Sequence, residues 1–177
     1  MEFSFYTRPI SNTLPQRSVT LSETFEWITS DKYEFVTRRI RVASTKEIRQ
    51  KLKTSILDYV TFSGEFEWRN NNELKTHSGL MVFDFDDLDD VEEVRQTLLN
   101  DPSIETALLF RSPSGNGLKW VVPIDLDSAT HQEWFEGIAN YLKATHGLGV
   151  DPSGKDVARA CFLCHDPNAY LNPKFSK

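Results

Sequence analysis

The fold and the candidate site are both decided by residues 77–90, which read HSGLMVFDFDDLDD. The apolar residues Leu80 to Phe83 predict a buried strand, whose side chains alternate between its two faces. Asp84 and Asp86 therefore share one face at the end of this strand. Two carboxylates held side by side repel each other unless a cation lies between them, and oxygen ligands suit Mg²⁺ or Mn²⁺. The stretch thus predicts a divalent cation site.

The acidic residues beyond Asp86 have a simpler explanation. They fit the start of a helix, where negative charge interacts favourably with the helix dipole; they include Asp89, Asp90, Glu92 and Glu93. This explanation leaves out Asp84 and Asp86, which lie where the apolar strand is still in progress. Because the pair is expected to repel, removing either carboxylate should leave the fold intact or stabilised.

The composition is that of a soluble globular protein. Of 177 residues, 39% are hydrophobic and 26% are charged, which is enough for one well-buried core. The sequence contains no internal repeat, low-complexity segment or Gly/Ser-rich linker, so it predicts a single domain over residues 1–177. Within that domain we expect a mainly helical part over residues 1–57 and a catalytic-type core over residues 58–177.

The sequence gives no sign of a membrane segment or an export signal. No apolar run approaches the roughly 18 to 20 residues that span a bilayer, and the start MEFSFYTRP lacks the basic and apolar blocks of an export signal. The two cysteines, Cys161 and Cys164, are too few for a disulfide framework, which fits a reducing compartment. We expect a cytoplasmic protein with no membrane partner.

The net charge of −6 argues against a nucleic-acid partner, but its distribution weakens the argument. Seven of the 26 acidic residues lie between Asp84 and Glu93, where a metal would neutralise part of the charge. A basic stretch lies upstream and contains Arg38, Arg39, Arg41, Lys46, Arg49, Lys51 and Lys53. Such a stretch is either a solvated helix face or a binding surface.

Strands and helices alternate along the chain. Strands are expected at residues 3–7, 59–66 with a turn, 80–83, 106–110, 118–124 and 158–163. Helices are expected after Thr20 and at residues 33–40, 48–56, 91–99 and 129–145, with capping boxes at Thr20/Glu23 and Ser44/Glu47. This order predicts an α/β fold of the α+β kind, with a mixed, mainly antiparallel sheet flanked by helices.

A glycine-rich turn between two of these strands is the second candidate motif. Residues 111–120 read RSPSGNGLKW. Ser114, Gly115 and Gly117 allow backbone amides to approach a phosphate, and Lys119 adds a positive charge. Asn-Gly is also among the strongest hairpin signals, so an ordinary β-turn explains the same letters.

The third candidate motif is VDPSGKDVAR at residues 150–159. Asp151 follows an apolar pair and can bring a third carboxylate to the same ions, while Arg159 can bind phosphate bidentately. Asp-Pro-Ser-Gly is equally typical of a plain turn. The functional interpretation requires that all three motifs meet in space.

Together the three motifs resemble those of the archaeo-eukaryotic primase superfamily, the primase-polymerase fold. The segments HSGLMVFDFDDLDD, RSPSGNGLKW and ARACFLCHDPNAYLNP resemble more closely the VirE-type N-terminal domain, as does FSGEF at residues 62–66. The resemblance covers most of the chain from about Arg41 onward. It implies a primase-polymerase-like domain with an RRM-like catalytic core.

The resemblance also implies roles for individual residues. Asp84, Asp86 and Asp151 would be catalytic metal ligands for Mg²⁺ or Mn²⁺. The nucleotide would be bound by a larger set, namely Ser112, Ser114, Gly115, Gly117, Lys119 and Arg159. Polymerising members usually have His where this chain has Lys119, and the two side chains are not geometrically equivalent.

The function that the resemblance implies is that of a metal-dependent nucleotide- and nucleic-acid-binding domain that transfers nucleotidyl groups with two divalent ions in DNA replication. The expected partners are a nucleoside triphosphate, a DNA or RNA template and primer, and a helicase-like ATPase of a mobile element. The alternative is a non-catalytic DNA- or nucleotide-binding module that guides a partner ATPase.

Three other chemistries are less well supported by the sequence. VFDFDD also resembles the first motif of haloacid-dehalogenase-like phosphatases, but the residue pair expected after it and a later Asp-Asp pair are missing. Residues 161–165, CFLCH, match the spacing of c-type haem attachment, which belongs to exported proteins. Two Cys and four His are too few to favour zinc.

Overall fold

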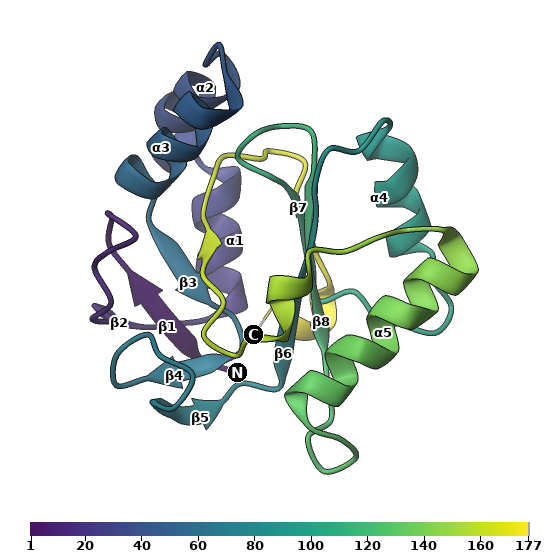
Figure 1. The fold of residues 1–177 in the computed structure, drawn as a ribbon. Coiled ribbons are helices and arrows are strands. Elements are labelled where there is room, and N and C mark those ends of the chain that lie inside the picture. The colour runs from purple at the N-terminus through teal and green to yellow at the C-terminus, as the bar shows by residue number, and fades with distance from the viewer. Residues whose placement is uncertain (177) are drawn as a thin grey trace.

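Two four-stranded antiparallel sheets form the centre of the molecule (Figure 1). The structure is a computed structural model, and it describes residues 1–176. The first sheet has the order β2–β1–β3–β9, with strands Arg17–Val19, Phe3–Tyr6, Tyr59–Thr61 and Cys161–Phe162. The second has the order β10–β7–β8–β6, with strands Tyr170–Leu171, Leu108–Arg111, Leu118–Pro123 and Leu80–Phe85. A separate hairpin pairs β4 (Gly64–Phe66) with β5 (Leu74–His77).

Five α-helices surround the sheets in the described residues. They are α1 (Leu21–Thr29), α2 (Glu34–Arg41), α3 (Lys46–Ile56), α4 (Val91–Leu99) and α5 (His131–His146). Figure 1 shows α4 and α5 on one side of the second sheet and the first sheet with α1 on its other side. Short 3₁₀ turns lie at η1 (Asp31–Tyr33), η2 (Pro152–Lys155) and η3 (Pro173–Phe175).

The predicted α+β fold with antiparallel strands is confirmed. The expectation of a single sheet is wrong, because the strands divide between two sheets and a hairpin. The first sheet collects strands from both ends of the chain, and such long-range pairing leaves no local signal in the sequence. It also joins residues 1–57 to the rest of the fold, since β1 pairs with β3 and β3 pairs with β9.

Both faces of β6 are buried, which explains its uninterrupted apolar run. Leu80 and Val82 belong to a core shared with the first sheet, whereas Met81, Phe83 and Phe85 pack with α4 and α5 in a second core. Alternation places Asp84 on the same side as Val82, toward the first sheet. The strand therefore directs this carboxylate between the two sheets.

Of the two predicted helix caps, one is present in the structure and the other lies one residue further along the chain. The capping box of Thr20 and Glu23 is present at the start of α1. At α3 the N-cap is Thr45, whose hydroxyl accepts a bond from the Ile48 amide at 3.2 Å, and not the predicted Ser44. Either hydroxyl can cap a helix, and α3 begins only at Lys46.

Other elements differ from their predictions mainly in length. Helix α4 has the predicted bounds, but β9 covers only Cys161–Phe162 of the predicted 158–163. The segment before β9 turns away, since the Ala158 amide bonds to the Asn71 side chain and the Arg159 amide bonds to the Asp156 carbonyl. Strands β2, β5 and β10 have polar or very short sequences and were not predicted. None of the helices in residues 1–176 has the length and apolar character that crossing a membrane requires.

A pair of histidines connects the hairpin to α5. His77 Nε2 lies 3.0 Å from His131 Nδ1, and His131 Nε2 lies 3.4 Å from the carbonyl oxygen of Gly154 in η2. Burial and the neighbouring His131 lower the pKa of His77 to about 4. Burial also lowers the pKa of His131, against the opposing effects of the Gly154 carbonyl and Asp156.

This pair predicts a pH dependence of stability. In the unfolded chain the pKa of His77 returns to about 6.5, so the unfolded state binds the proton more readily than the folded state. The folded protein therefore loses stability as the pH falls from about 6.5 to about 4. We expect the urea midpoint of the wild type to fall more steeply over this interval than that of a His77→Gln variant. Parallel curves for the two proteins would contradict the assignment.

Candidate functional site

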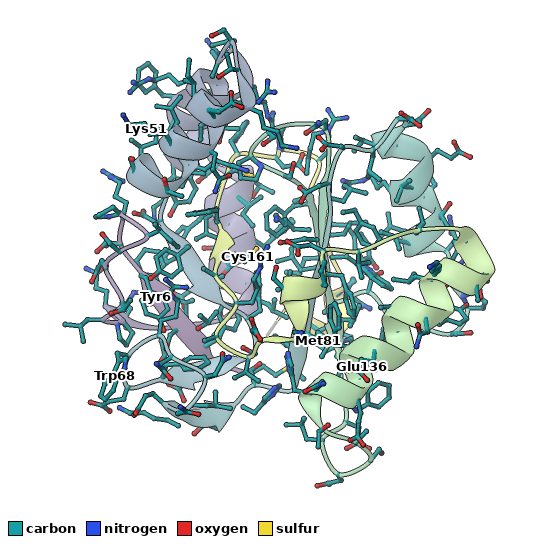
Figure 2. All side chains as sticks on the ribbon, viewed as in Figure 1. Tyr6, Lys51, Trp68, Met81, Glu136 and Cys161 are labelled. Atoms are coloured by element: carbon teal, nitrogen blue, oxygen red, sulfur yellow. The ribbon has the colours of Figure 1, made fainter. Side chains whose placement is uncertain are left out.

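A polar cavity of about 630 Å³ lies where β6, β8, α3, the β4–β5 loop and the segment before β9 come together. Its lining carries four acidic and four basic side chains: Asp84, Asp86, Asp151, Asp156, Lys53, Arg69, Lys119 and Arg159. In Figure 2, Cys161 on β9 lies between the two sheets, next to the segment that carries Arg159. The cavity has the size of a small-molecule site, and its charges are balanced.

Asp84 and Lys119 form a buried ion pair at the floor of this cavity. They face each other in the register of β6 and β8, and Lys119 Nζ lies 2.6 Å from Asp84 Oδ1. The side chains are only 5% and 11% exposed. Burial is the largest single influence and lowers the pKa of Lys119, but the charge and hydrogen bond of Asp84, with smaller effects of Cys161 and Asp86, together outweigh burial and hold that pKa above its usual value. Lys119 is therefore a fixed positive charge.

Arg159 joins Asp84 to Asp151. Its Nη2 atom donates to Asp84 Oδ2 at 2.9 Å and to Asp151 Oδ2 at 2.7 Å. Burial lowers the pKa of Arg159, but Asp84 and Asp151 outweigh burial and raise it. The structure thus brings together two acidic residues that are far apart in the sequence.

Backbone and hydroxyl contacts fix Asp151 in place. Its amide donates to the Asp84 carbonyl at 3.0 Å, so the start of η2 covers the outer edge of β6. Its Oδ1 atom accepts bonds from the Ser153 amide and hydroxyl at 2.9 and 2.7 Å. Burial alone raises the pKa of Asp151, but the bonds from Ser153 and the charge of Arg159 outweigh it and lower the pKa.

Asp86 lines the same cavity but is exposed and stands apart from this network. Among residues 1–176 no hydrogen bond or ion pair of its carboxylate is found. Asp86 also lines a second hollow of about 150 Å³ next to the first. Gln50 and Lys53 of α3 line both hollows as well, so the two spaces are neighbours.

The glycine-rich loop lies beside the second hollow and not in the main cavity. Ser114 and Asn116 line this hollow, whereas the nearly buried Ser112 lines neither. Gly115 has a φ of +87°, with Arg41 packed over it. A Cβ at Gly117 would lie 2.2 Å from the Phe85 carbonyl oxygen. The two glycines are thus explained by the turn and by close contact with β6.

Several residues of the cavity were not predicted as site residues. Lys53 is the most informative, because no ion pair to it is found in residues 1–176 and burial, with Lys119 nearby, lowers its pKa. The basic stretch in the sequence was its only signal. Arg69, Asn70 and Asn71 come from the hairpin loop, and Phe162 adds an aromatic ring. None of these residues belongs to a recognisable motif.

The arrangement does not present a ready metal site in the described residues 1–176. No group of three or more His, Cys, Asp or Glu side chains there is placed to hold a metal ion. The carboxylate of Asp84 is not free to bind a metal ion, because the positive charges of Lys119 and Arg159 already balance its charge. The repulsion expected between Asp84 and Asp86 is therefore offset, and removing Asp84 would leave a buried lysine without its partner.

The cysteines take no part in the site. Cys161 and Cys164 are free and lie in the core between the two sheets. Burial raises the pKa of both thiols. The position of Cys161 in β9 agrees with the strand expected at residues 158–163.

Comparison with curated proteins and with solved structures gives no significant match. A family model described as "BT4734-like, N-terminal domain" matches residues 51–171, a range that includes the three acidic residues, the glycine-rich loop, Lys119 and Arg159. This match corrects the assignment to the VirE-type N-terminal family and to the primase superfamily, since the matched family is a different one. Because the match covers more than half of the sequence, the chain belongs to the BT4734-like N-terminal domain family.

Proposed function

We propose that the cavity binds a nucleoside triphosphate together with Mg²⁺ or Mn²⁺ and transfers nucleotidyl groups to a nucleic-acid 3′-hydroxyl. The observation that supports this most is the convergence of Asp84 and Asp151 on one cationic nitrogen, at 2.9 and 2.7 Å, in a cavity that Asp86 also lines. Proteins commonly bind Mg²⁺ through one or two carboxylates, and waters and substrate phosphates supply the other ligands. Basic residues around them are what a triphosphate requires.

In this proposal Asp84, Asp86 and Asp151 hold the divalent cation. When bound, the cation would lower the pKa of the 3′-hydroxyl and neutralise charge on the α-phosphate. The carboxylates fit this role chemically, but Asp84 and Asp151 must first exchange their present partner, Arg159. No side-chain nucleophile is needed.

The basic residues of the cavity bind the phosphates in this proposal. Lys119 is held at the floor by Asp84, and Lys53 reaches the cavity from α3. Phe162 and Ile10 provide the apolar surface on which a base can pack. The volume of about 630 Å³ lies within the range that holds a nucleotide-sized ligand.

Helix α3 supplies the surface for the DNA or RNA strand in this proposal. Lys46, Arg49 and Lys53 share one face of the helix and line the second hollow together. They extend over about 10 Å along the helix axis. Lys46 pairs with Asp87 at 3.0 Å, but both side chains are largely exposed, so this bond is weak and easily exchanged for a phosphate. The proposed further partner is a helicase-like ATPase of a mobile element, and the proposed compartment is the cytoplasm.

A second candidate is a binding module without catalysis. The compensation of Asp84 by both Lys119 and Arg159 favours it, because a catalytic metal would have to displace one of them. Primer extension with a template, Mn²⁺ and labelled nucleotides separates the two functions. Product that disappears in an Asp86→Asn variant supports transfer, whereas nucleotide binding without product supports the binding module.

We predict that Asp86→Asn and Asp84→Asn both weaken Mn²⁺–dATP binding by about tenfold or more, as measured by calorimetry. Only Asp84→Asn should also destabilise the fold, by about 3–5 kcal/mol, because it leaves Lys119 buried and unpaired. Asp86 is exposed, so its replacement should leave the urea midpoint unchanged. Unaltered Mn²⁺–dATP affinity in Asp86→Asn would contradict the site.

We predict that the face of α3 toward the hollow binds a single strand. A triple variant, Lys46→Gln, Arg49→Gln and Lys53→Gln, should bind a labelled oligonucleotide about tenfold more weakly in EDTA by fluorescence anisotropy. The salt slope of its binding should fall by about 2, the value for three phosphate contacts on a single strand.

The matched control removes the same charge from other surfaces of α2 and α3: Arg38→Gln, Arg39→Gln and Lys51→Gln. All three residues are exposed, and Figure 2 shows Lys51 on the outer side of α3. The control should bind nearly as well as the wild type. Equal losses in the two triple variants would show that only net charge matters and that this face of α3 is no binding surface.

A further inference from the structure

We propose that Arg159 is a built-in counter-ion, which occupies the divalent cation position in the empty protein and moves to the phosphates when a metal–nucleotide complex enters. This inference rests on the proposed function, and it concerns how that site is regulated. It predicts that a metal ion alone binds poorly and that metal and triphosphate bind cooperatively. The argument starts from the contacts that Arg159 makes and those that it lacks.

A single guanidinium nitrogen makes both carboxylate contacts. Nη2 lies 2.9 Å from Asp84 Oδ2 and 2.7 Å from Asp151 Oδ2, so it stands between two of the carboxylates that would hold a cation. The Nε atom of Arg159 is buried without a hydrogen-bond acceptor in the described residues. Arg159 therefore uses few of its five donors here, although arginine usually binds a carboxylate with two parallel bonds.

The side chain of Arg159 has room to move, but its backbone does not. The side chain is 30% exposed and lines the cavity, so a swing toward bound phosphates needs no opening of the core. The backbone is held on both sides, since Ala158 before it donates to Asn71 and Cys161 after it pairs with Val60 in the first sheet. An exchange of partners is thus confined to one flexible side chain.

The charge balance of the site explains why the movement of Arg159 should couple the binding of the metal ion to the binding of the triphosphate. Asp84 and Asp151 are now neutralised by Lys119 and Arg159. A divalent cation added to this group would bring two excess positive charges next to a guanidinium in a half-buried site. A triphosphate supplies the missing negative charge and gives Arg159 new acceptors. The metal should therefore bind tightly only when phosphates arrive with it.

The experiment measures Mn²⁺ binding to the full chain by calorimetry, first without nucleotide and then with dATP. Arg159→Met removes the charge and keeps an apolar side chain in its place. We expect this variant to bind Mn²⁺ alone about tenfold more tightly than the wild type, and Mn²⁺–dATP more weakly. The gain in Mn²⁺ affinity on adding dATP, large in the wild type, should largely disappear.

Two further variants serve as controls. Lys155→Met removes the same charge from an exposed position in η2 and should leave Mn²⁺ affinity close to that of the wild type. Arg159→Lys keeps the charge and should keep the weak Mn²⁺ binding of the wild type. Tighter Mn²⁺ binding in Arg159→Lys as well would show that an altered fold, and not the lost charge, explains the affinity of Arg159→Met. Thermal unfolding of each variant accompanies the titrations.

The outcomes separate this inference from the proposed function. If the wild type binds Mn²⁺–dATP but Arg159→Met binds Mn²⁺ alone no more tightly than Lys155→Met, the counter-ion role is wrong and the proposed function stands. If Arg159→Met gains Mn²⁺ affinity while no variant binds dATP, the counter-ion role is supported and nucleotide binding is wrong.

Discussion

The buried carboxylate of Asp84 is the constraint on which the rest of the site depends. A charge at this depth costs several kcal/mol of desolvation unless opposite charges and hydrogen bonds compensate it. Lys119 provides one partner from the neighbouring strand, and Arg159 provides the other from a segment 75 residues away. Because Arg159 also binds Asp151, the network joins β6, β8, η2 and the approach to β9. The position of every charged group at the cavity floor follows from this one requirement.

The second sheet makes such a site possible, because it has apolar neighbours on both faces. Met81, Phe83 and Phe85 pack against α4 and α5, and the opposite face packs against the first sheet. Strand β6 is consequently buried up to Phe85, and Asp86 follows where the strand ends and the surface begins. The same strand therefore presents one carboxylate that is enclosed and one that is open to solvent. The fold therefore depends on the carboxylate of Asp84 and not on that of Asp86.

Local sequence patterns were enough for the helices and the longer strands, but not for the short strands β2, β5 and β10 or for the assembly of the sheets. The apolar run of β6, the bounds of α4 and the Thr20 cap follow from spacing and capping chemistry, which act over a few residues. The division into two sheets depends on pairing between distant strands. Within the site, the motifs identified Asp84, Asp151, Lys119 and Arg159, and the fold brings them together. The motifs could not indicate that Arg159 contacts carboxylates, because that contact depends on burial. They also could not indicate that α3 lies over the cavity.

The arrangement of the first sheet bears on how this domain can be delimited. The family match begins at residue 51, inside α3, yet β1 and β2 precede it and β1 is the direct neighbour of β3. A polypeptide trimmed to the matched range would lack β1, so the amides and carbonyls of Tyr59–Thr61 on that edge of β3 would be unpaired. An unpaired strand edge of this kind favours pairing with strands of other molecules. It would also uncover Val60 and Phe62, which now pack beneath Phe3 and Phe5. The first fifty residues thus share a core and a sheet with the matched range.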